Sequence, residues 1–290
     1  MGKKTKTGIG VAIILLVAGY FGLKAYAAHV AEENISRTAD KVSGFLDLDY
    51  RKVSVDLFGF NTHIKNVRIA GINRQQQVKI DDIVIYRVDP QDRVPASLHV
   101  KFNGINVNPD QLGQGGAALR QMGYTTIKAD TELDYTYDRA QRTLAINKFR
   151  TGAAELGDIQ LTCRIANIDL NPANLPVLLF TFPNILLDRA RVTYQDHSLV
   201  KRFLELAARQ QGQPYDAFMK ALNKKLEDKI AGQSDPFLIQ GMTAFKQFLN
   251  NPDAITISVL PDEPVSIARL QKVKDGDELI KLLHAKAYVN

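Results

Sequence analysis

The residue types that most often carry catalysis or bind metals are spread thinly along this chain. Its five histidines are His29, His63, His99, His197 and His284, and no two of them stand at the HxxxH or HExxH spacing of a metal site. Asp81 and Asp82 are neighbours on a predicted strand, so their side chains point to opposite faces and share no proton. No Gly-x-Ser-x-Gly nucleophile motif is present. The sequence therefore predicts a protein that is not an enzyme, with no cofactor, no catalytic residue and no metal site.

The single cysteine, Cys163, excludes an internal disulfide. In "DIQLTCRIANIDL" it alternates in phase with Ile159, Leu161 and Ile165, which places all four on one face of a strand. We therefore expect Cys163 to be a small buried core residue rather than a reactive thiol.

The chain starts with lysines that are followed by a long apolar stretch. Residues 8–28 are almost wholly apolar, and Lys3, Lys4 and Lys6 precede them. About 20 apolar residues span a bilayer, which predicts one transmembrane helix with residues 1–7 in the cytoplasm. The alternative is a signal peptide that is cleaved after "AYA". The transmembrane interpretation predicts a single-pass protein of the bacterial inner membrane, with its bulk in the periplasm.

The spacing of apolar residues divides the rest of the chain into predicted helical and β-rich segments. Helical spacing predicts a stalk over residues 29–45, and alternation with Gly and Asn turns predicts a β-rich domain over 46–195. Three amphipathic helices follow over 196–252, and strands over 253–290 complete the sheet. The predicted fold is α+β: one N-terminal transmembrane helix, a curved antiparallel meander, and a three-helix layer packed on the sheet.

The predicted helices offer apolar stripes for this packing. Leu199, Phe203 and Leu206 form one stripe, and a second consists of Leu238, Met242, Phe245 and Leu249. A net charge of +6 over 290 residues is too small and too dispersed to indicate nucleic acid binding.

Two stretches offer candidate contacts for a ligand. The segment 175–187, "LPVLLFTFPNILL", is apolar but too short to cross a bilayer. It is either a buried segment, which we expect, or an exposed lip that contacts lipid or a partner through Leu178, Phe180 and Phe182. Lys220 and Lys224 lie on one predicted helix and either contact anionic headgroups or form an ordinary solvated face.

The layout is similar to that of two groups of bacterial envelope proteins. "YRKVSVDLFGFNTHIKNVRIAG" resembles the start of AsmA-like proteins, and "LDYTYDRAQRTLAINKFRTGAAELGDIQLTCRIANIDL" resembles the strand pairs of YdgA-like proteins. The resemblance covers roughly residues 8–170, and the helices of 196–252 depart from it. It implies an inner-membrane anchor, a curved periplasmic sheet and a link to lipid homeostasis, and it carries over no catalytic residue.

Two functions follow as hypotheses. The first is a membrane-anchored, non-enzymatic periplasmic protein for envelope maintenance or lipid handling, with membrane lipid as its partner. The second is a structural or assembly subunit of a larger inner-membrane protein complex. The sequence identifies neither the ligand nor the protein partner nor the oligomeric state.

Overall fold

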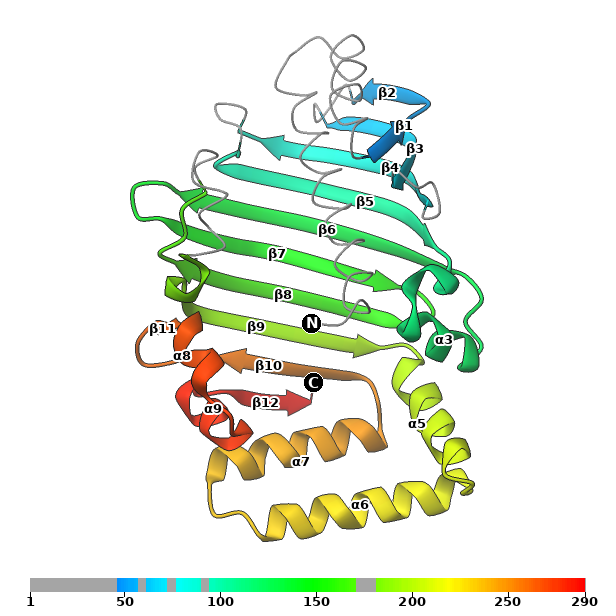
Figure 1. The fold of residues 1–290 in the computed structure, drawn as a ribbon, viewed down its shortest axis with the longest axis vertical. Helices are drawn as coiled ribbons and strands as arrows, with labels where there is room; N and C mark the ends of the chain where they lie inside the picture. Colours follow the sequence, from blue (N-terminus) through cyan, green and yellow to red (C-terminus); the bar gives the residue numbers. More distant parts are fainter. Residues whose placement is uncertain (1–45, 57–60, 72–76, 90–93, 171–180, 290) are drawn as a thin grey trace. The chain divides into compact units, whose positions relative to one another are not determined.

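The computed structural model describes residues 46–56, 61–71, 77–89, 94–170 and 181–289. The chain divides into two compact units, of which the first ends at Tyr137 and the second begins at Asp138. The elements of both units are labelled in Figure 1.

The first unit is an antiparallel sheet with a short helical connection. Its strands are β1 (Leu46–Asp49), β2 (Lys52–Val55), β3 (Thr62–Gly71), β4 (Gln77–Val88), β5 (Ser97–Val107) and β6 (Ile127–Asp138). Strands β1 and β2 both pair with β3, and β3, β4, β5 and β6 follow one another in antiparallel pairs. The 3-10 helix η1 (Pro109–Leu112) and helix α3 (Gln114–Gln121) connect β5 to β6.

Alternation gives the sheet of the first unit one apolar face. Every second residue of β4 and β5 is buried along much of their length, as the period of a strand requires. The resulting core consists of Ile64, Val67, Ile69, Val78, Ile80, Ile83, Ile85, Leu98, Val100, Phe102 and Ile105. These side chains are between 1% and 6% exposed, so the first unit has a closely packed aliphatic core.

The second unit contains a further antiparallel set of strands. These are β7 (Thr143–Ala153), β8 (Gly157–Ala166), β9 (Leu186–Asp196), β10 (Ala254–Val259), β11 (Val265–Ser266) and β12 (Lys286–Val289). The pairing order is β7, β8, β9, β10, β12, and β11 pairs with β9. The antiparallel sheet that the sequence predicted is therefore confirmed in both units.

The helices of the second unit do not form the predicted layer on the sheet. They are α5 (Leu199–Gln210), α6 (Tyr215–Ala231), α7 (Pro236–Asn250), α8 (Ile267–Lys272) and α9 (Gly276–Leu282), and the 3-10 helix η2 (Phe182–Asn184) precedes β9. Helix α7 contacts β12 and β10, α6 contacts α7, and α5 contacts α6. Figure 1 shows α7 and then α6 beyond β12. Helix α6 buries no residue, whereas α7 buries Leu238, Ala244 and Phe248, so the helices extend sideways from the sheet edge instead of covering a face together.

The predicted membrane span requires a correction. Among the described residues, no helix is long and apolar enough to cross a membrane. Helix α6, for example, has 17 residues and carries charges along its whole length, whereas a bilayer core needs about 20 apolar residues. For the part of the chain that the structure describes, this finding contradicts the predicted transmembrane helix, and with it the single-pass assignment and the inner-membrane location. Residues 8–28 and the stalk over 29–45 lie outside the described residues.

Candidate functional site

Three neighbouring rows on one face of the sheet in the second unit carry no charged side chain. Directly paired residues of antiparallel strands point to the same side of a sheet, so the register assigns each row of paired residues to a face. The middle row is Phe149, Leu161, Val192, Ile257 and Ala287, one residue from each of β7, β8, β9, β10 and β12. The rows beside it are Ile146, Cys163, Ala190 and Val259, and Thr151, Ile159, Tyr194, Ile255 and Val289. We call these three rows the apolar face.

The centre of the apolar face is open to solvent. Ile159 is 42% exposed, Val192 36% and Ile257 45%, although each lies on a strand with a neighbour on both sides. Leu161 and Phe149 beside them are half-buried. Isolated exposed aliphatic residues are common on soluble proteins, but a contiguous set without any charge marks a binding surface.

Cys163 belongs to the apolar face and is half-buried, not fully buried as the sequence predicted. Its register partners Ile146 and Ala190 confirm the predicted strand phase. Burial raises the pKa of the Cys163 thiol, and a hydrogen bond involving the Ile146 backbone opposes this rise in part. The thiol is therefore protonated at neutral pH, and the structure gives it no role as a nucleophile.

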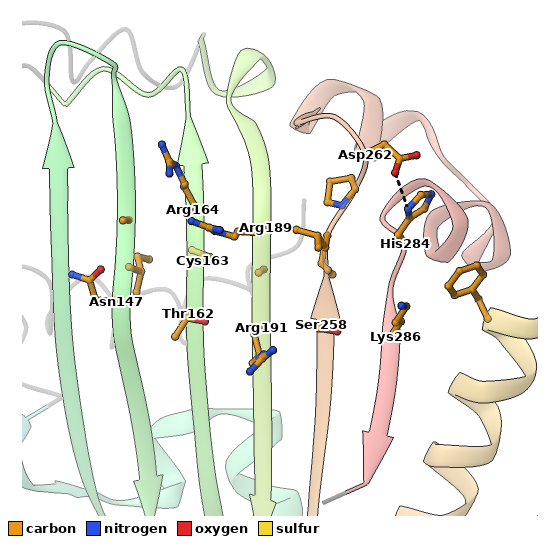
Figure 2. A pocket seen from close by; sticks show the side chains of 17 residues that line it. Asn147, Thr162, Cys163, Arg164, Arg189, Arg191, Ser258, Asp262, His284 and Lys286 are labelled. Carbon is orange, nitrogen blue, oxygen red and sulfur yellow. Dashed lines mark ion pairs between the residues drawn. The ribbon is translucent and has the colours of Figure 1, made fainter.

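The opposite face of the same strands carries a hollow with a volume of about 930 Å³. Figure 2 shows Arg164, Arg189 and Arg191 on neighbouring strands, with Lys286 further along the sheet. Phe237, Leu260 and Pro261 contribute apolar lining. We call this hollow the cationic groove.

The end of the cationic groove beside α7 is organised around His284. Its Nδ1 atom lies 3.3 Å from Oδ1 of Asp262, and its ring stacks on Phe237 with the centroids 6.2 Å apart. The ammonium of Lys286 lies 5.9 Å from the centroid of the same Phe237 ring, within the range of a cation–π contact. Helix α7 thus forms part of the wall through its first turn, where Asp235 caps the helix by accepting a hydrogen bond from the Phe237 N–H at 2.9 Å.

The contact residues predicted from the sequence do not form one site in the described structure. Phe182 is 46% exposed and lies in η2, which contacts α8. Lys220 and Lys224 are exposed on α6, which contacts α5 and α7. Leu178 and Phe180 lie outside the described residues.

Sequence reasoning missed both faces of this sheet. The signal was the alternation in "LDRARVTYQD", where Arg189 and Arg191 fall on one side of a strand and Ala190, Val192 and Tyr194 on the other. A single strand, however, does not reveal which residues of its neighbours lie opposite, because the register fixes that.

The comparisons with known proteins extend over both units. A family model described as "Uncharacterized protein" matches residues 150–290, which include most of the second unit. A protein of Aquifex aeolicus (strain VF5) with the description "Uncharacterized protein" is 23% identical over 303 residues, which cover 97% of this chain and 98% of that protein. Neither description states an activity or a ligand. The resemblance to AsmA-like and YdgA-like proteins stays a prediction.

Proposed function

We propose that this chain is a lipid-handling protein that holds acyl chains on the apolar face, and that it acts by binding rather than by catalysis. The observation that carries the proposal is the charge-free set of rows across five strands with Ile159, Val192 and Ile257 exposed at its centre. An acyl chain needs contact with methyl and methylene groups and no hydrogen-bonding partner, and these rows offer that surface.

The expected binding energy for a single acyl chain corresponds to a weak affinity. A fully buried methylene contributes about 0.8 kcal/mol. A chain of roughly ten methylenes that lies half-buried on the sheet therefore gains about 4 kcal/mol from burial, which corresponds to a dissociation constant of about 1 mM. A second chain or contacts to the headgroup would be needed for micromolar affinity.

A second candidate function is that of an assembly subunit that binds a protein partner. Phe203 on α5 is 57% exposed and Phe245 on α7 is 47% exposed, and exposed aromatic side chains are enriched at protein interfaces. The two functions differ in which surface carries them: strands β8, β9 and β10 for acyl chains, and helices α5 and α7 for a protein partner.

The acyl-chain proposal can be tested by titration with the fluorescent fatty acid cis-parinaric acid. Val192→Lys and Ile257→Lys each place a charge in the middle row of the apolar face. We expect each to weaken binding at least tenfold, because desolvating an ammonium opposes contact with the acyl chain. Both positions are partly exposed, so the circular dichroism spectrum and the melting temperature should change little.

Gln195→Lys is the matched control, because Gln195 is exposed on the same strand β9 and pairs with Asp158, outside the three rows of the apolar face. It adds the same charge without entering that face, so its affinity should equal that of the unmodified chain. Equal affinity in all four proteins would exclude the apolar face as the acyl site. A loss of partner capture with Phe203→Ser and Phe245→Ser, without any fatty-acid binding, would favour the assembly function.

A further inference from the structure

The register of the second unit concentrates cationic side chains on the face opposite the apolar face. Arg164 on β8 pairs directly with Arg189 on β9, and Arg191 pairs with Thr162 on one side and Ser258 on the other. Ser258 in turn pairs with Lys286 on β12. Two adjacent rows of four strands thus carry three guanidinium groups, one ammonium and two hydroxyl groups on the floor of the cationic groove.

These charges are poorly compensated within the described part of the chain. Arg164 has a carboxylate partner in Asp188, but Nε and Oδ2 are 3.6 Å apart, beyond the 2.7–2.9 Å typical of a charged hydrogen bond. Arg189 and Arg191 are exposed and form no ion pair with any described carboxylate. Like charges that face each other across a strand pair destabilise a sheet. Packing therefore does not account for this arrangement, whereas an anionic ligand would.

The chemistry of the floor favours phosphate oxygens. A guanidinium presents a rigid fork of N–H donors that matches two oxygens of one phosphate, and its charge persists at all physiological pH values. Thr162 and Ser258 lie beside Arg191 and add hydroxyl donors to the same row. A phosphate ester with two or three free oxygens can occupy several of these donors at once, while a carboxylate has only two oxygens.

The remainder of the groove suits an organic group attached to the phosphate. Leu260 is 64% exposed and Phe237 is 37% exposed, and both line the hollow together with Pro261. A volume of about 930 Å³ is large for a free phosphate ion and falls in the range of sites for small organic ligands.

We propose that the cationic groove is a binding site for an organic phosphate ester, with the phosphate on Arg164, Arg189 and Arg191 and the organic group beside Phe237 and Leu260. The same chemistry is offered by a soluble phosphate ester and by the headgroup of a phospholipid. The proposal is separable from the acyl-chain proposal, because the Arg164, Arg189 and Arg191 side chains lie on the face opposite the apolar face. The outer row of the apolar face, Ile146, Cys163, Ala190 and Val259, also lines the hollow.

Isothermal titration calorimetry in a buffer free of phosphate and sulfate tests the site with three probes: inorganic phosphate, phenyl phosphate and diheptanoyl phosphatidic acid. We expect phenyl phosphate to bind more tightly than inorganic phosphate, because its ring gains the apolar lining. Tighter binding of phosphatidic acid than of phenyl phosphate would assign the ester to a lipid, and the reverse order would assign it to a soluble compound. Both orders support the site.

Arg191→Gln should weaken phenyl phosphate binding at least tenfold, and Arg191→Lys should weaken it less because the charge remains. Arg209→Gln is the matched control, since Arg209 is exposed at the end of α5 and does not line the groove. Because Arg191 makes no ion pair with a described residue, Arg191→Gln should keep or raise the melting temperature. Val192→Lys should leave phenyl phosphate binding intact, so failure of the acyl-chain proposal is separable from failure of this one.

Two results would overturn the proposal. One is the absence of binding heat with all three probes at millimolar concentration. The other is an unchanged affinity for phenyl phosphate in Arg191→Gln, which would show that the guanidinium groups do not hold the ester.

Discussion

The Nδ1 atom of His63 lies 2.8 Å from Oδ2 of Asp82, and its other ring nitrogen lies 3.1 Å from Oδ2 of Asp56. Asp82 belongs to β4, and Asp56 directly follows β2, so the ring of His63 on β3 links two of the strands that pair with β3. A neutral imidazole has one N–H donor, whereas two carboxylates are both satisfied only by the protonated ring with two donors. The stability of this edge of the first unit therefore depends on the protonation of His63.

The first prediction is a pH dependence of the first unit's stability. Burial lowers the pKa of His63, but the hydrogen bonds to Asp82 and Asp56 outweigh it and raise the pKa above 6.5. A raised folded-state pKa stabilises the fold fully below the unfolded value of about 6.5, and this contribution is lost as pH rises through the folded value. The hydrogen bond from His63 also lowers the pKa of Asp56. The stability that the Asp56 carboxylate contributes is therefore lost only as the pH falls through this lowered pKa.

Urea unfolding at a series of pH values between 5.5 and 8.5 measures this effect. The unmodified chain should lose stability with rising pH across this window, and His63→Gln should remove that part of the slope. Asp82→Asn should move the NMR titration midpoint of His63 to lower pH. An identical pH slope in the unmodified chain and in His63→Gln would show that the link contributes nothing to stability.

The second prediction concerns Gly104 at a bulge of β5. The bulge lies where the pairing of β5 with β6 shifts between Phe102 and Ile105. The φ of +65° at Gly104 lies in the left-handed region, and a Cβ atom there would collide with the Asp81 carboxylate and the Lys128 side chain. Gly104→Ala should therefore cost about 1–3 kcal/mol of unfolding free energy through backbone strain. Gly115→Ala is the control, because a Cβ at this exposed position of α3 meets no atom within 4 Å. It should leave stability unchanged or raise it by up to about 1 kcal/mol. Equal urea midpoints for the two variants would contradict the assigned conformation of Gly104.

The sequence predicted strands well because alternation is a local property, but it predicted the contacts of helices poorly. In α7 the expected stripe included Phe245, yet this side chain is 47% exposed while Ala244 and Phe248 are buried. Helix α7 carries apolar residues on several sides, so its own periodicity does not select the buried side. That selection is made by the contacts with β12 and β10, which are distant in sequence.

The two faces of the sheet in the second unit also combine a feature that is local in sequence with one that depends on distant strands. The opposite positions of Arg191 and Val192 on β9 follow from a period of two and were readable from the sequence. The approach of Arg164 and Lys286 to Arg191 depends on the pairing of β8, β9, β10 and β12. Strand β12 lies nearly a hundred residues beyond β9 in the chain, with helices between them, so no local pattern reports this neighbourhood.

The third prediction concerns the accessibility of Cys163. Because the thiol is half-buried and burial raises its pKa, iodoacetamide should label the native chain at least tenfold more slowly than the unfolded chain at pH 7.5. Labelling should still proceed without unfolding, and its rate should rise with pH. Since Cys163 lies on the apolar face beside Ile146, a bound fatty acid should slow the labelling further. A rate that saturating fatty acid leaves unchanged would show that the acyl chain does not cross this row.

The last prediction separates two neighbouring residues of the apolar segment 175–187. Phe182 is 46% exposed, whereas Ile185, three residues later, is 5% exposed. Ile185 is also fixed by its backbone, because its carbonyl accepts a hydrogen bond from the Ile267 N–H at 2.9 Å. Phe182→Asp should therefore change the unfolding free energy by less than about 0.5 kcal/mol, and Ile185→Asp should cost several kcal/mol because it buries an unpaired charge.

Urea unfolding of both variants at pH 7.5 distinguishes the two interpretations of this segment. A uniformly buried segment requires both variants to unfold, which is the result that the apolar sequence predicts on its own. The structure instead requires a stable Phe182→Asp variant beside an unfolded Ile185→Asp variant, because the chain passes from solvent into the sheet between these positions. If the stable variant also loses fatty-acid binding, Phe182 belongs to the acyl-binding surface. If its binding is unchanged, the apolar face of β8, β9 and β10 suffices without it.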